Sequence, residues 1–216
     1  MRTAMGMAPR AGTAGNSSPA PLAAEVDRRG RGIPVKQIAR SPRPGYHPAG
    51  MNARVHSSIL QGIDALVCEV ESDVAKGGMG ELKLVGLAEA SVKESVSRIQ
   101  AALRNSGYRW PGPKVTINLA PADVKKDSAA FDLPIAVATM LAGGMFQSEK
   151  VREYIIVGEL ALDGRVRPVR GVLATAMLAR QLSERGRQAG PEDGPYVRGV
   201  IVPADNAAEA AVVEGV

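Results

Sequence analysis

The sequence predicts an α+β domain, with a mixed sheet and packed helices, over residues 51–216, preceded by a disordered tail over residues 1–50. Apolar and polar residues alternate in several short segments, which is typical of half-buried strands. Amphipathic helical segments lie between some of them, but strands also follow one another directly, so the order is not that of an alternating α/β fold. The tail is rich in Pro, Gly, Ser and Arg and lacks periodic apolar residues, so it cannot bury enough surface to offset its ordering entropy.

Three strands open the domain. The segment LVCEVE places Leu66, Cys68 and Val70 on one face of a strand, which makes Cys68 a small core residue. A turn at residues 62–64 joins this strand to the one before it. We therefore expect strands at Arg54–Leu60, Ala65–Glu71 and Leu82–Val85.

The clearest helix covers Glu89–Asn105, where Val92, Val96, Ile99 and Leu103 recur at helical spacing. Gly107 follows it at a position where a left-handed C-terminal cap is favoured. A strand at Val115–Leu119 comes next, and a polar turn then leads into a short helix at Asp132–Leu141.

The last third of the domain contains a hairpin signal, Leu162-Asp163-Gly164, which separates two strand-like segments. We expect strands at Tyr154–Val157, Arg165–Val169 and Gly199–Val202, and helices at Gly171–Glu184 and Asp205–Glu214.

The formal net charge of +5 is carried by the tail. Residues 1–50 hold eight Lys or Arg and two Asp or Glu, which leaves 19 basic and 20 acidic residues in 51–216. A basic tail can attract nucleic acid without sequence preference, so a stand-alone DNA-binding module is one alternative and a merely solvated tail is another. No apolar run reaches the ~20 residues that span a bilayer. With a single cysteine and no predicted membrane contact, we expect a cytoplasmic protein.

No cofactor or metal site is predicted for this chain. It contains neither a Walker A string nor a G-x-G-x-x-G string, so the glycine segment Lys76–Gly80 is interpreted as a mobile loop. His47 and His56 are isolated and form no zinc-binding pattern.

Five segments together give a resemblance to a known family. They are GIDALVCEVE, LKLVGLAEASVKESVSRIQAALRNSGYRWP, KVTINLAPADVKKDSAAFDLPIAVA, VGELALDGRVRPVRGVL and VPADNAAEAAVVEGV. In this order they resemble the N-terminal domain of the ComM/YifB group of Mg-chelatase-like AAA+ ATPases. The resemblance implies a fold like the Lon proteolytic domain. It also implies an AAA+ motor and a C-terminal chelatase-like domain, which this chain lacks, and ATP and Mg²⁺ would bind only to that absent motor.

The Lon-like comparison also implies where a Ser-Lys dyad would lie. It places Asp132 at the serine position, in the turn between strand and helix, and Thr175, or a neighbour, at the lysine position, on the helix from Gly171. An Asp and a Thr cannot act as a nucleophile and its base. Asp132 can instead cap the helix that it precedes. Ser128, beside Lys125 and Lys126, is a weak alternative nucleophile, which keeps a Ser-Lys peptidase open as an alternative function.

The resemblance therefore implies a non-catalytic domain of a hexameric, ATP-driven machine that acts on DNA during transformation and recombination. The expected partners are an AAA+ motor, in cis or in trans, and DNA. Candidate surfaces for DNA or a partner are the glycine loop and a set of cationic residues. These cationic residues are Lys125, Lys126, Arg165, Arg167 and Arg170.

Overall fold

The computed structural model describes residues 24–26, 32–34, 51–75, 81–86, 88, 90–188 and 196–216. The strands are β1 Ala24–Val26, β2 Gly32–Pro34, β3 Met51–Gln61, β4 Asp64–Ala75, β5 Glu81–Val85, β6 Lys114–Ala120, β7 Tyr154–Ile156, β8 Glu159–Leu160, β9 Val166–Arg167 and β10 Gly199–Val202. The α-helices are α1 Ala90–Asn105, α2 Asp132–Ala142, α3 Val172–Gln188 and α4 Ala207–Ala210, with short 3₁₀ turns at Ala129–Phe131, Lys150–Glu153 and Ala204–Asn206.

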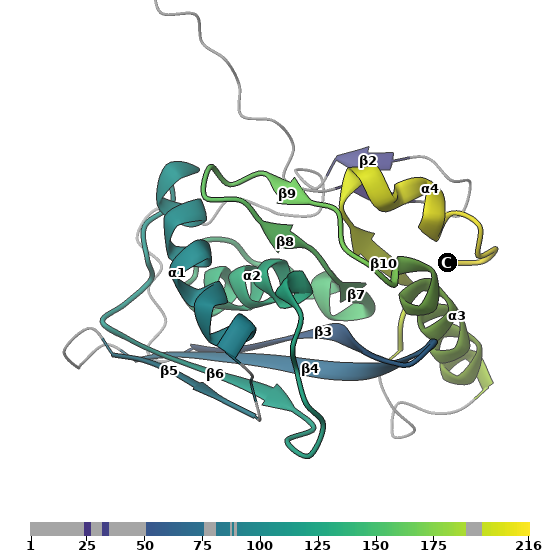
Figure 1. Cartoon of the computed structure of the whole chain (residues 1–216), viewed down its shortest axis with the longest axis horizontal. Helices are drawn as coiled ribbons and strands as arrows, with labels where there is room; N and C mark the ends of the chain where they lie inside the picture. The colour runs from purple at the N-terminus through teal and green to yellow at the C-terminus, as the bar shows by residue number, and fades with distance from the viewer. Residues whose placement is uncertain are drawn as a thin grey trace, which may run out of the picture.

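These strands form a mixed eight-stranded sheet in the order β2-β1-β10-β7-β3-β4-β6-β5, and β8 and β9 form a separate hairpin (Figure 1). The predicted α+β class with a mixed sheet is thereby confirmed. Within residues 1–50, the structure describes β1 and β2, which extend the sheet beyond β10. The glycine loop 76–80 lies outside the described residues. None of the helices in the described segments combines the length and apolarity needed to cross a bilayer.

The long β3–β4 hairpin lies in the middle of the sheet, and helices pack on both of its faces. It pairs Met51 with Val74 at one end and Gln61 with Asp64 at the other. Because neighbouring side chains on a strand point to opposite faces, Ser72 and Ser58 lie on different sides of the sheet. Ser72 contacts Thr139 of α2, and Ser58 contacts Thr175 of α3. Helices α2 and α3 therefore cover opposite faces.

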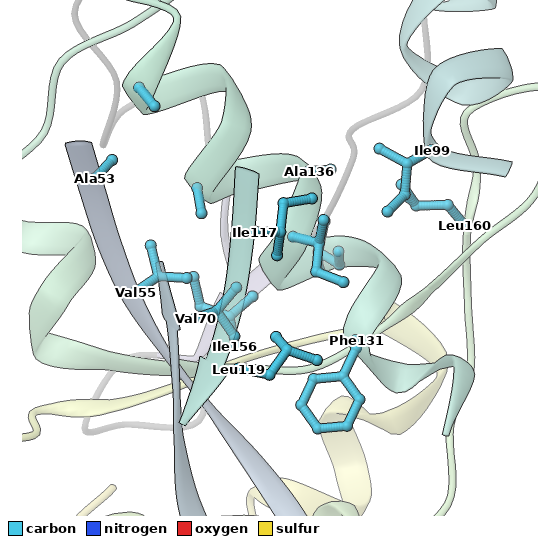
Figure 2. Packing of buried hydrophobic residues seen from close by; sticks show 14 of the residues in the cluster. Ala53, Val55, Val70, Ile99, Ile117, Leu119, Phe131, Ala136, Ile156 and Leu160 are labelled. Atoms are coloured by element: carbon cyan, nitrogen blue, oxygen red, sulfur yellow. The ribbon is translucent and has the colours of Figure 1, made fainter. Parts of the chain in front are cut away.

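Two apolar cores correspond to these two faces. The larger core packs α1 and α2 against the sheet and is built almost entirely from aliphatic side chains, with Phe131 among its few aromatic residues (Figure 2). It includes Val55, Val70, Ile117 and Leu119 from the central strands. The smaller core packs α3 and α4 against β7 and β10. Cys68 is fully buried, as its position on the strand predicted.

The predicted pairing around the late hairpin turn is wrong in one respect. The turn forms, but its strands are β8 and β9, whereas the strand predicted at Tyr154–Val157 forms β7, Tyr154–Ile156, in the large sheet. The chain changes direction at Gly158, whose N–H donates to the carbonyl of Ala130 and whose carbonyl accepts from the N–H of Leu133. These bonds to the start of α2 take the chain out of the sheet before the hairpin begins.

Candidate functional site

The turn between β6 and α2 is the place where the sequence predicted that a nucleophile, if present, would lie. Ser128 lies at the start of the 3₁₀ turn Ala129–Phe131, with extended backbone angles, and its Oγ accepts a hydrogen bond of 3.1 Å from the N–H of Ala130. The hydroxyl therefore caps the turn. This capping role accounts for the serine without any chemistry at its oxygen.

Lys126 is completely buried, so the prediction that it belongs to an exposed cationic surface is wrong. Its Nζ donates to the carbonyl oxygen of Pro121, five residues earlier in the same turn. Its backbone forms an isolated parallel bridge with Ala88. The lysine thus ties the turn to the segment before α1, and its ammonium group is unavailable to DNA or to a partner.

Lys126 also acts on Cys68, which lies on the core face of β4 opposite Ser57 of β3. Burial raises the pKa of the Cys68 thiol from 9.0 to about 12, the charge of Lys126 lowers it in part, and Glu69 raises it. The thiol is therefore protonated at neutral pH and is a poor nucleophile.

This shifted pKa predicts a dependence of stability on pH. Because the folded-state pKa lies above 9.0, the contribution of Cys68 is fully present below pH 9 and is lost as the pH rises toward 12. We expect the wild-type chain to lose about 1 kcal/mol of unfolding free energy per pH unit from this group in that window. Urea unfolding between neutral pH and about pH 11 measures the loss. In the Cys68→Ala variant, the unfolding free energy should fall less steeply with pH over this window, whatever its absolute value. Equal slopes of unfolding free energy against pH in both proteins would contradict the raised pKa of Cys68.

Asp132 occupies the position that the Lon-like comparison gives to the serine, and it forms a buried ion pair. Its carboxylate accepts from Nε and Nη2 of Arg98 on α1, at 2.9 and 3.1 Å, and from the N–H of Leu160 on β8, at 3.1 Å. The bond to Asp132 raises the pKa of Arg98. The predicted helix cap is wrong, because Asp132 is itself the first residue of α2 and its carboxylate joins α1, α2 and β8 instead.

Thr175 occupies the predicted lysine position and is also fully engaged. Its Oγ1 donates to the carbonyl of Gly171 at 3.0 Å and lies 2.8 Å from Oγ of Ser58. Because the single hydroxyl proton of Thr175 goes to Gly171, Ser58 must donate to Thr175. This buried pair fastens α3 to β3.

The structure does not bring Asp132 and Thr175 together as a dyad. Asp132 bonds to α1 and β8, whereas Thr175 bonds to β3 and to its own helix. The residue at the entry to α2 that shares a core with α3 is Ala130, which packs in the cluster of Val172 and Ala176. Sequence reasoning did not identify this contact between the entry to α2 and α3, and an alanine side chain offers no nucleophile.

The other predicted cationic residues are exposed, and Arg165 and Arg167 each contact an acidic side chain. Arg165 contacts Asp163 at 2.8 Å, and Arg167 contacts Glu159 at 3.3 Å. Lys125 and Arg170 are exposed on separate segments. Within the described residues, no group of three or more His, Cys, Asp or Glu side chains is arranged to hold a metal ion.

Comparison with known proteins gives a consistent set of relatives. The chain matches the family described as subunit ChlI of Mg-chelatase over residues 70–187. It is 40% identical over 161 residues to the uncharacterized protein YifB of Escherichia coli (strain K12), covering 74% of this chain and 29% of that protein. It is 39% identical over 133 residues to the competence protein ComM of Haemophilus influenzae, covering 62% of this chain and 26% of that protein.

An uncharacterized protein of Mycobacterium tuberculosis (strain H37Rv) is 37% identical over 163 residues, covering 76% of this chain and 30% of that protein. The chain therefore spans less than a third of the length of these relatives.

Proposed function

Because this chain belongs to the Mg-chelatase ChlI family, in its ComM/YifB group, we propose that it is a non-catalytic, Lon-like domain of an ATP-driven machine that processes DNA during transformation. One observation carries the proposal: the two positions where a Ser-Lys dyad would lie hold Asp132 and Thr175, whose side chains form hydrogen bonds that join elements of the fold. The name of the relative ComM, a competence protein, supports the link to DNA uptake. The motor that binds ATP and Mg²⁺ would act on this domain in cis or in trans.

The alternative of a Ser-Lys peptidase receives no support from the geometry. A dyad needs a hydroxyl beside a lysine that takes its proton. Ser128 Oγ caps a turn, Lys126 Nζ is bound to Pro121, and the sequence has no lysine after Lys150. We propose instead that the domain's own role is assembly of the machine, guidance of DNA or docking to the motor.

The proposal is tested in the host by removing the chain and measuring two steps of transformation separately. We expect the integration of incoming linear homologous DNA to fall while the uptake of labelled DNA stays at the wild-type level. Restoring the chain with Ser128→Ala should recover integration completely, since the serine has only a capping role.

Two results would overturn the proposal. Unchanged integration after removal of the chain would end the assignment to DNA processing. Failure of Ser128→Ala to restore integration, with the variant present at wild-type abundance, would instead favour the peptidase.

A further inference from the structure

Two segments far apart in the sequence meet at one corner of the molecule, where the end of α1 lies beside the turn of the β8–β9 hairpin (Figure 1). Nδ2 of Asn105 donates to the carbonyl of Leu162 at 2.7 Å. Gly164 lies so close to Ser106 that an added Cβ would come within 2.0 Å of the serine Oγ. The two segments are therefore locked together as one surface. We refer to Arg104, Tyr108, Arg109, Leu162 and Arg165 as the α1–hairpin corner.

The chain just after α1 holds a fixed shape. Gly107 adopts a φ of +84°, the N–H of Gly107 donates to the carbonyl of Arg104, and the N–H of Tyr108 donates to that of Leu103. This is the hydrogen-bond pattern of a left-handed helix cap. Trp110 then packs against the larger core. Tyr108 and Arg109 are thus held between two anchored points while their side chains remain exposed, Tyr108 at 38%.

The corner carries more positive than negative charge. Arg104 and Arg109 are exposed and form no ion pair with any described residue, whereas Arg165 is paired with Asp163. Elsewhere on the surface, Arg167 and Arg180 are each matched by a carboxylate, whereas Arg152, Arg170 and Arg185 are exposed on three different segments without an ion pair to a described residue. The corner differs from these in placing two such arginines beside an exposed aromatic residue. A basic residue in the last turn of a helix is favoured by the helix dipole, which accounts for Arg104. Arg109 lies beyond the helix and has no such explanation.

Resting on the proposed function, we propose that the α1–hairpin corner binds single-stranded nucleic acid. Arginine side chains contact phosphates, and an exposed aromatic ring gives a platform on which a base can stack. The unpaired guanidinium groups of Arg104 and Arg109 would contact the phosphates, and the ring of Tyr108 would stack against a base. An acidic peptide would use the same charges but would gain little from a stacking ring.

The test is binding of the full chain to a fluorescent oligothymidylate, measured by anisotropy over a series of salt concentrations. The variant Arg104→Gln/Arg109→Gln removes two phosphate contacts, so we expect the slope of log affinity against log salt to fall in magnitude by about 1.4. The matched control is Arg152→Gln/Arg185→Gln, which removes the same charge from exposed arginines on other elements. Residues 1–50 are unchanged in every protein, so any contribution of the basic tail cancels.

Stacking is tested separately from charge. Tyr108→Ala should weaken binding about tenfold at every salt concentration. Tyr108→Phe keeps the ring and should bind as the wild type does. Thermal unfolding of each variant checks that the fold is retained.

Each possible result decides the matter. Equal losses in the corner and control variants would overturn the proposal, as would wild-type binding by the corner variant; in both cases the proposed function would stand. Equal affinity for duplex and single strands, with no effect of Tyr108→Ala, would overturn the assignment to single strands. No binding by the wild type would overturn the corner proposal and count against DNA guidance as this domain's role.

Discussion

Asp132→Ala is expected to lower the free energy of unfolding by about 3 kcal/mol, because it breaks a buried ion pair from one side. Asp132 is fully buried, and its carboxylate accepts three hydrogen bonds from Arg98 and Leu160. Without it, the guanidinium of Arg98 keeps only Ser95 as a described hydrogen-bond acceptor, with Glu159 and Glu94 as more distant charges, and the N–H of Leu160 loses its acceptor. Because the side chain of Arg98 is 26% exposed, water can relieve part of the cost, so we expect the lower end of the range for buried pairs.

The measurement is urea denaturation of the full chain, with a matched variant at an exposed pair. Asp163→Ala removes a carboxylate that contacts the Arg165 side chain and accepts the backbone N–H of Arg165, but both side chains are in water, so a much smaller loss of stability is expected. The double variant Arg98→Met/Asp132→Leu should be more stable than Asp132→Ala, since it leaves no unpaired charge. If Asp132→Ala and Asp163→Ala were equally stable, the buried pair would not have the structural role assigned to it.

The elements of the fold could be predicted because their signals are local. The alternation in LVCEVE fixed which residues of β4 face the core, and β4 buries Cys68 and Val70 as expected. Gly107 likewise ends α1 in the left-handed conformation that its position indicated. Each of these predictions depends on neighbours within a few residues, where periodicity and backbone preference carry the information.

The side-chain partners at the candidate site could not be predicted in the same way. Asp132 and Arg98 are 34 residues apart, and only the packing of α1 on α2 brings them together. Lys126 lies in a run of polar residues, a pattern that predicts an exposed loop. Its side chain can be buried because the carbonyl of Pro121, in the same turn, accepts a hydrogen bond from its ammonium group. The change of direction at Gly158 depends on bonds to the start of α2, which no local pattern reveals. Long-range contacts of this kind decided which predicted residues remain on the surface.

Gly86→Ala is expected to be the most disruptive of the glycine substitutions at the sheet, with a loss of about 3 kcal/mol or more in unfolding free energy. Gly86 directly follows β5 and has a φ of +99°, which a residue with a side chain rarely adopts. A Cβ there would lie 2.1 Å from the carbonyl oxygen of Leu119 and 2.9 Å from its carbonyl carbon. These are backbone atoms at the end of β6, so no side-chain rotation can relieve the clash.

The clash can be separated from the backbone strain by a matched variant. Gly62, in the turn between β3 and β4, also has a positive φ, of +65°, but a Cβ there would meet nothing within 4 Å. Gly62→Ala should therefore cost only the strain of a left-handed alanine, about 1 kcal/mol. Part of the additional loss in Gly86→Ala reflects its φ, which lies further from the left-handed minimum, and the rest reflects displacement of β5 from β6.

Hydrogen exchange detects this displacement directly. Because β5 is the strand at one edge of the sheet, Gly86→Ala should reduce the protection of amides in the β5–β6 pairs, whereas Gly62→Ala should leave those amides protected. Equal stability of the two variants, with unchanged protection in both, would contradict the close approach of Gly86 to Leu119.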